Sequence, residues 1–159
     1  MADFTQDKAV EIMRSERFCM LTSVGDQGRL HSHPMTPQEV TDDGNIWFFI
    51  DTTSDHAESL RQEKRVNVAF ADSSTWLSVA GHASLHDNRA KIDALWNKTV
   101  EAWFPDGKDS PGVGLLLVES DSAEYWDSPG GRVASVLAYA KSRVTGERPD
   151  VGESESTDL

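Results

Sequence analysis

Short apolar runs, each broken by turn-forming residues, dominate the first 126 positions of the chain. They cover residues 17–24, 30–40, 46–50, 66–71, 76–85 and 113–118, and residues 122–126 continue the last run past a bulge. Alternation and enrichment in β-branched and aromatic residues are typical of strands. Turn signals at 25–28 and 42–45 predict that the first three strands form an antiparallel meander. Gly81, in the middle of its run, predicts a bulge or a bend.

Apolar residues at helical spacing predict short helices between and after these strands. The first covers residues 7–15 with Thr5 as N-cap, and the second begins at Ser54 or Asp55 and ends near Arg65. A third follows Asp87, and a last peripheral helix spans residues 133–144. Sequential hairpins with interposed short helices indicate an α+β, barrel-like domain of about six strands rather than a doubly wound sheet.

The domain organisation follows from length and composition. The 159 residues show no break in composition before the C-terminus, which predicts one domain over residues 1–148. Residues 149–159 are acidic and almost without large apolar side chains, so we expect a disordered tail. The N-terminus has no basic region followed by an apolar run, and no stretch approaches the ~20 apolar residues of a membrane span. We therefore expect a cytoplasmic protein with no membrane partner.

The charge of the chain restricts its partners. A formal net charge of −12 leaves no basic stripe for a nucleic-acid backbone, so we expect no nucleic-acid partner. Binding of one small phosphate stays compatible with this charge, because backbone N–H groups and a local His or Arg can hold it. The single cysteine, Cys19, excludes an intramolecular disulfide and a cysteine-based zinc cluster, and its apolar surroundings predict a buried thiol.

The stretch His31-Ser32-His33-Pro34 is the first candidate for chemistry. On a strand, His31 and His33 would share one face, about 6.6 to 6.8 Å apart along the chain, which suits two ligands of one metal ion. No third ligand stands at a recognised metal spacing, so half-buried polar residues on a sheet face are the preferred explanation and we predict no metal site. Pro34 cannot donate to a ladder and predicts an interrupted or edge strand, where a ligand can reach the backbone.

The second candidate is the junction from Phe49 to His56. A strand ends there, Thr and Ser hydroxyls follow, and a helix begins, so hydroxyls, free N–H groups and an imidazole suit an anion, in particular a phosphate. An ordinary capped helix is the simpler explanation, and Asp51 and Asp55 would repel an anion unless they turn away. The chain has no nucleophile elbow, cysteine–histidine signature or distinctive carboxylate pair, so any chemistry is expected to come from a cofactor.

Seven short pieces in order resemble the pyridoxamine 5'-phosphate oxidase-like superfamily of FMN-binding split-barrel proteins, and within it the general stress protein branch. They lie between about residues 5 and 127 and read FCMLTS (18–23), SHPM (32–35), IWFFID (46–51), WLSVAG (76–81), LW (95–96), WFPDG (103–107) and AEYWD (123–127). Each piece is weak alone, and the seven in this order are fairly specific.

This resemblance implies a six-stranded antiparallel split β-barrel with short peripheral helices, which forms a homodimer and holds FMN in a cleft between the subunits. The strand that runs along the flavin in such relatives matches Ser32, His33, Pro34, Met35 and Thr36. The strand end and helix start that hold the ribityl phosphate match Phe49, Ile50, Asp51, Thr52, Thr53 and His56. Trp126 and Arg132 match positions that reach the cofactor from the other subunit.

Two basic anchors of such relatives are replaced here. His33 stands where they usually carry Arg, and His56 where they usually carry Lys. A neutral imidazole offers one donor where guanidinium offers a fork of five, so weaker phosphate binding is expected. At mildly acidic pH we expect both rings to be charged, because the unperturbed pKa is about 6.5.

The resemblance therefore implies an FMN-binding general stress protein, with a flavin-dependent oxidoreductase of an unknown small substrate as one form of that function. The alternative is a non-catalytic flavin-binding or flavin-free stress protein that lost tight FMN binding through His33 and His56. A deazaflavin or haem in place of FMN also stays open, and a metal-binding module built on His31 and His33 ranks last. Pyridoxamine phosphate oxidase activity itself is not expected, because no basic motif follows Trp126.

Overall fold

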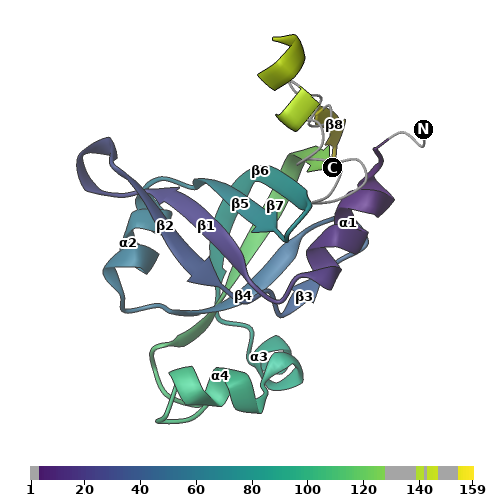
Figure 1. The fold of residues 1–159 in the computed structure, drawn as a ribbon. Coiled ribbons are helices and arrows are strands. Elements are labelled where there is room, and N and C mark those ends of the chain that lie inside the picture. The colour runs from purple at the N-terminus through teal and green to yellow at the C-terminus, as the bar shows by residue number, and fades with distance from the viewer. Residues whose placement is uncertain (1–3, 128–138, 142, 147–153) are drawn as a thin grey trace.

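One antiparallel sheet with short helices at its margins makes up the computed structural model, which describes residues 4–127, 139–141, 143–146 and 154–159 (Figure 1). The strands are β1 (Cys19–Val24), β2 (Leu30–Met35), β3 (Glu39–Val40), β4 (Ile46–Asp51), β5 (Arg65–Ala71), β6 (Thr75–His86), β7 (Val113–Asp127) and β8 (Ser154–Asp158). The helices are α1 (Gln6–Ser15), α2 (Asp55–Gln62), α3 (Arg89–Leu95) and α4 (Lys98–Trp103), with a 3-10 turn η1 (Asp26–Gly28). None of the described helices has the length and apolar content needed to cross a membrane.

The sheet has the order β2-β1-β5-β6-β7-β4-β3, with β8 added on β7. Its inward side chains form one core to which α1 also contributes, as shown by Met13, Leu21, Phe48, Val68 and Leu116. The predicted α+β split-barrel class is confirmed. The strand count is eight rather than six, because the short strands β3 and β8 were not expected.

The predicted meander of the first three strands is wrong. The run 30–40 divides into β2, which pairs with β1, and β3, which pairs with β4 instead. Strand β4 then pairs with β7 rather than with β2. Pro37 explains the break, because it cannot donate to a ladder, and the chain leaves the β1–β2 hairpin there.

The long strands β6 and β7 contain the bulge predicted at Gly81. Ala80 pairs with Ser122 and Gly81 with Ser120, which leaves Asp121 as the extra residue on β7. A Cβ on Gly81 would lie 2.4 Å from the carbonyl oxygen of Glu119. Glycine is therefore needed for the close approach of the two backbones at this point.

The helical segment after β6 differs from the predicted single helix. Asn88 rather than Asp87 caps α3, and its side chain accepts from the N–H of Lys91. A second helix, α4, begins after Asn97, whose side chain accepts from the N–H groups of Thr99 and Val100. A second N-cap in the middle of the run accounts for the division.

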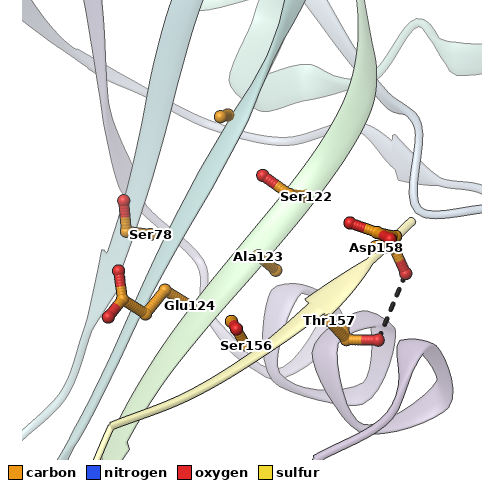
Figure 2. A pocket seen from close by; sticks show the side chains of 8 residues that line it. Ser78, Ser122, Ala123, Glu124, Ser156, Thr157 and Asp158 are labelled. Atoms are coloured by element: carbon orange, nitrogen blue, oxygen red, sulfur yellow. Dashed lines mark hydrogen bonds between the residues drawn. The ribbon is translucent and has the colours of Figure 1, made fainter.

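The expectation of a disordered tail is wrong for residues 154–158, which form β8 along residues 122–126 of β7 (Figure 2). The terminal Leu159 supplies the missing apolar contact, because it packs against the core and its N–H donates to the carbonyl of Asp121 (3.0 Å). The Glu155 carboxylate also accepts from the N–H of Phe4 (2.9 Å). The predicted domain boundary at 148 and most of the helix predicted at 133–144 fall outside the described residues.

Candidate functional site

Strand β2 and helix α2 bring two predicted site residues into direct contact. His33 pairs with the buried Leu21, so it lies on the inner side of β2, and His56 lies in the first turn of α2. Their rings are stacked, with centroids 3.9 Å apart and planes 12° from parallel. The two imidazoles predicted to replace basic phosphate anchors therefore lie next to each other.

His31 joins this pair to form what we call the histidine cluster, His31, His33 and His56. His31 pairs with the buried Ser23, which confirms that His31 and His33 share one face of the strand. Its ring packs on the backbone of Gly25, where an added Cβ would lie 2.6 Å from Cδ2 of His31. Among the described residues, no group of three His, Cys, Asp or Glu side chains is placed to hold a metal ion.

The electrostatics of His56 differ from the expectation of a readily charged ring. Burial, then the neighbouring His33 and then His31, lower the pKa of His56 to about 4. His56 is therefore neutral at neutral pH and stays so in mild acid. Its Nε2 atom is buried and has no hydrogen-bond partner among the described residues. The cluster thus contains an unsatisfied polar atom, and His56 is not a cationic anchor at neutral pH.

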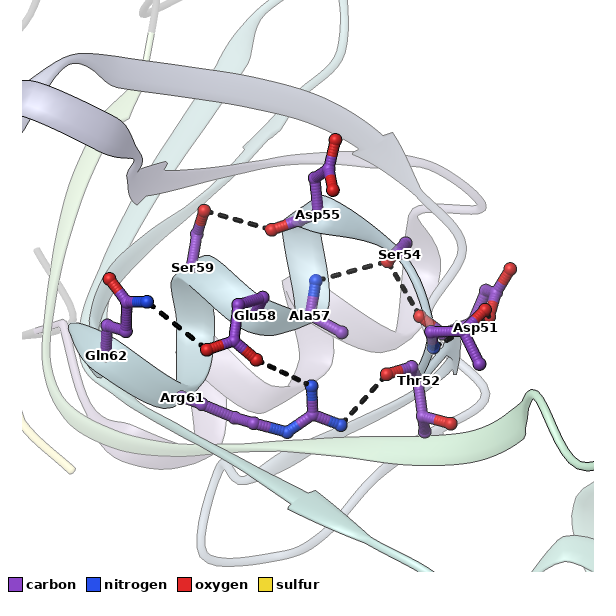
Figure 3. Close-up of polar contacts among 10 residues, drawn as sticks. Asp51, Thr52, Ser54, Asp55, Ala57, Glu58, Ser59, Arg61 and Gln62 are labelled. Carbon is purple, nitrogen blue, oxygen red and sulfur yellow. Dashed lines mark hydrogen bonds and ion pairs between the residues drawn. The ribbon is translucent and has the colours of Figure 1, made fainter.

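The start of α2 is a well-capped helix, as the simpler interpretation of this segment predicted. The Ser54 hydroxyl accepts from the N–H of Ala57 (3.1 Å) and donates to the carbonyl of Asp51 (2.7 Å), as Figure 3 shows. The Asp51 carboxylate accepts from the N–H (2.9 Å) and hydroxyl (2.6 Å) of Thr53, which lowers the pKa of Asp51. In the part of the chain that the structure describes, the backbone N–H groups of Asp55 and His56 have no acceptor.

Thr52 is held by the loop that precedes β7. Its N–H and hydroxyl both donate to the carbonyl of Gly112, at 2.9 and 3.3 Å. A Cβ on Gly114 would lie 2.3 Å from Cγ2 of Thr52, so glycine is needed for this close packing. The Thr52 carbonyl accepts from Nη2 of Arg61 (2.9 Å; Figure 3).

The side chains of two predicted site residues on β4 pack in apolar clusters. Ile50 is buried in the main core. Phe49 belongs to a second apolar cluster, in which its ring centroid lies 5.6 Å from that of Trp96 and 6.3 Å from that of Phe104. These residues position the end of β4, and their side chains are occupied by apolar neighbours.

Strand β2 lies at the edge of the sheet, which confirms the position predicted from Pro34. Pro34 pairs with Met20 on the outer face, and the Ser32 hydroxyl lies 2.7 Å from that of Thr22. Trp126 pairs with Trp76 on the same outer face.

The remaining predicted residues of the segment 32–36 have structural contacts. The Met35 carbonyl accepts from Cys19 Sγ (3.5 Å), and the Thr36 carbonyl accepts from Gln38 Nε2 (3.1 Å). Arg132 lies outside the described residues.

Two hollows in the described part of the chain have linings that contain none of the three clustered histidines. One, of about 390 Å³, lies on the outer face between β6, β7 and β8, and Figure 2 shows Ser78, Ser122, Glu124 and Asp158 around it. Its described lining contains hydroxyls and carboxylates without a basic side chain, which disfavours a phosphate there. The other, of about 310 Å³, is lined in part by Thr52, Arg61, His86 and Arg89.

Sequence reasoning missed the second hollow. In the sequence, Arg61 is an ordinary basic residue in the last turn of a helix. Arg89 is an ordinary residue at the start of the next helix. Nothing in their spacing indicates that the fold brings them to one cavity.

Comparisons with known proteins agree with the fold. A family model described as "Pyridoxamine 5'-phosphate oxidase like" matches residues 5–150. The chain is 29% identical to Protein bli-3 of Neurospora crassa over 153 residues, 89% of this chain and 73% of that protein. It is 26% identical to General stress protein 26 of Bacillus subtilis over 124 residues, 73% of this chain and 84% of that protein. The solved general stress FMN/FAD binding protein of Xanthomonas citri is 34% identical, covers 77% of this chain and 87% of its own, and superposes with a TM-score of 0.66.

Proposed function

The chain belongs to the pyridoxamine 5'-phosphate oxidase-like family, and we propose that it is a general stress protein that binds FMN at the histidine cluster. One observation carries the proposal: the buried Nε2 of His56 has no hydrogen-bond partner among the described residues. An unsatisfied buried polar atom costs about 1–3 kcal/mol, which a ligand atom at this point would relieve. Similarity to the FMN/FAD binding protein of Xanthomonas citri supports a flavin as that ligand.

The donors around the cluster fit a phosphate that is held without a strong cation. The backbone N–H groups of Asp55 and His56 are open, and α2 places its positive end beside them. The hydroxyl and N–H of Thr53 donate to the Asp51 carboxylate. These hydrogen bonds limit the repulsion between that carboxylate and a bound anion. His33 and His56 contribute imidazole nitrogens. This set of donors supports binding that is weaker than a guanidinium or ammonium anchor would give.

A bound flavin supplies electron transfer between a reduced donor and a small acceptor, and we propose this class of reaction for any catalytic role. The chain itself would bind and orient the cofactor. Cys19, the sole thiol, lies in the core, where burial raises its pKa to about 12, so it is not a nucleophile.

We propose a homodimer formed through the outer face of the sheet. Met20 and Trp76 are 42% and 41% exposed there, and the small residues Ala69 and Ala71 lie between them on β5. An exposed apolar area of this kind suits a second copy of the chain. Trp126, directly opposite Trp76, would then face the partner subunit.

The second candidate is a flavin-free or non-catalytic stress protein. The low pKa of His56 favours it, because a pair in which His56 is neutral attracts a phosphate less than the two cations that the family resemblance implies. The two candidates differ in whether the purified chain binds FMN at all.

A titration with FMN tests the proposal. The visible spectrum of the protein as purified and quenching of FMN fluorescence by apo protein would report binding. We expect saturable binding that weakens about tenfold or more in His56→Ala and in His33→Ala, since each removes a hydrogen-bonding partner. His82→Ala is the matched control, because His82 pairs with Asp121 at the β7 bulge, outside the cluster. A chain that fails to bind FMN near both pH 5 and pH 7 would overturn the flavin proposal and favour the second candidate.

A further inference from the structure

We propose that the cavity between α2 and α3 is a second binding site, which takes a small organic oxyanion, a carboxylate or a phosphate monoester. The cavity measures about 310 Å³. Two arginines, Arg61 and Arg89, line it together with His86 and Thr52. Its lining shares Thr52 with the predicted flavin segment but contains none of the three histidines of the cluster, so the two proposals can be tested separately.

The Arg61 guanidinium is held in place with donors to spare. Its Nη2 donates to the Thr52 carbonyl (2.9 Å) and its Nη1 to the Glu58 carboxylate (3.3 Å), as Figure 3 shows. Thr52 is itself fixed by two hydrogen bonds to Gly112. Nε of Arg61 has no acceptor among the described residues, and the side chain is 45% exposed. Arg61 is therefore preorganised and reachable from solvent.

Arg89 is fixed in the same manner from another element. Its Nε pairs with the Asp87 carboxylate (2.9 Å), and its Nη1 donates to the Lys108 carbonyl (3.1 Å). In the described part of the chain, Nη2 has no acceptor, and the side chain is 46% exposed. A guanidinium held at one edge and open at another matches the geometry that binds carboxylate and phosphate oxygens.

His86 adds an oriented polar group to the cavity. Its Nε2 lies 2.8 Å from the Ser84 hydroxyl, and its ring meets the Trp47 ring edge-on at 5.4 Å. These contacts leave Nδ1 without a partner among the described residues. Leu85, Pro111 and Val113 supply apolar lining, which suits a ligand with a small organic body.

The charges around the cavity are balanced rather than acidic. Asp87 is the acidic residue among those that line it and pairs with Arg89, while Arg61 pairs with Glu58 of its own helix. The chain as a whole has a net charge of −12. A charge-balanced hollow with two guanidinium groups is therefore more favourable for a small anion than the surrounding acidic surface.

NMR titrations of the ¹⁵N-labelled full chain at constant pH and ionic strength test this site. Inorganic phosphate, succinate and acetate are the probes, and they separate the phosphate source from the carboxylate source. We expect saturable shifts of the Nε–Hε signals of Arg61 and Arg89 with one of these classes. We expect Arg89→Gln to weaken binding about tenfold or more, since it removes a charge-assisted hydrogen-bond donor.

Three control variants distinguish anion binding at this cavity from a general effect of protein charge. Arg65→Gln is the matched arginine variant, because Arg65 is bound to Glu63 on the surface, outside the cavity, and it should leave affinity unchanged. His56→Ala should weaken FMN binding but not anion binding, so failure of one proposal is distinguishable from failure of the other. Arg89→Lys keeps the charge without the fork and should also weaken binding, which covers the case in which Arg89→Gln does not fold. Shifts that never saturate, or equal losses in Arg65→Gln, would overturn the site and leave the arginines as structural ties.

Discussion

The rings of His33 and His56 lie face to face, 3.9 Å apart and 12° from parallel. Two charged imidazoles at that separation would repel each other strongly, so the arrangement requires at least one neutral ring. Burial and the neighbouring histidines provide this by lowering the pKa of His56 to about 4. Where the family resemblance implies two permanent cations, this chain therefore has a pair that carries one positive charge at most near neutral pH.

Restoring a cation at this position should strengthen FMN binding. We expect His33→Arg to raise FMN affinity by about tenfold, because guanidinium forms charge-assisted, forked hydrogen bonds with phosphate. Fluorescence quenching of FMN measures the change, with His82→Arg as a control of equal charge at a distant site. Equal affinities in the wild-type chain and His33→Arg would show that the phosphate does not sit at the cluster.

The low pKa of His56 predicts that stability falls in mild acid. The folded pKa is about 4 and the unfolded pKa about 6.5, so between them the unfolded state binds more protons and the free energy of unfolding rises with pH. Lowering the pH through this window should destabilise the fold. Because the ring is only half-buried, we expect a loss on the order of 1 kcal/mol.

Urea unfolding near pH 7 and near pH 5 measures this loss of stability. His56→Gln removes the titrating group and should reduce the difference between the two pH values, while His82→Gln should keep it. A His56→Gln chain that loses as much stability in acid as the wild-type chain would contradict the assignment.

The elements that could be predicted from sequence are those fixed by local chemistry. The Thr5 cap, the Gly81 bulge and the edge position of Pro34 each depend on one residue and its neighbours. Pairings between distant segments could not be predicted in this way. The pairing of β4 with β7 and the docking of β8 through Leu159 depend on contacts that no periodicity encodes.

The same distinction applies to the candidate site: the local position of its residues could be predicted, and their contacts could not. The chain order placed His33 on a strand and His56 at a helix start, but their stacking and the lowered pKa of His56 arise only where the folded chain brings the two rings together. The shared cavity of Arg61 and Arg89 is likewise a property of the folded chain.

Gly114 should tolerate no side chain unless Thr52 is trimmed. A Cβ at Gly114 would lie 2.3 Å from Cγ2 of Thr52, so Gly114→Ala should destabilise the protein by about 1–3 kcal/mol. Thr52→Ser removes that methyl and keeps the hydroxyl. In urea unfolding, the double variant should lose less than the sum of the two single variants. Strict additivity would show that the clash is relieved elsewhere.

The proposed dimer face should be sensitive to charge. We expect Trp76→Glu to produce a monomer in light scattering and to weaken FMN binding, because a buried unpaired carboxylate at an apolar interface is strongly unfavourable. Trp103→Glu is the matched control, since Trp103 is 79% exposed on α4, away from this face. A Trp76→Glu chain that remains dimeric would exclude this face as the interface.

The docking of the C-terminal strand should depend on its last side chain. Strand β8 presents Glu155 and Asp158 to a β7 segment that itself contains Glu124, so charge does not favour the pairing, and Leu159 provides its apolar contact with the core. Leu159→Ala should lower the free energy of unfolding by about 1 kcal/mol and raise the hydrogen-exchange rates of the β8 amides. Ser154→Ala, at the exposed start of the strand, should change neither. If the β8 amides exchange as fast in the wild-type chain as in Leu159→Ala, the strand is held by something other than Leu159. If they exchange more slowly only in the wild-type chain, a single terminal side chain converts a polar, acidic segment into an ordered edge strand.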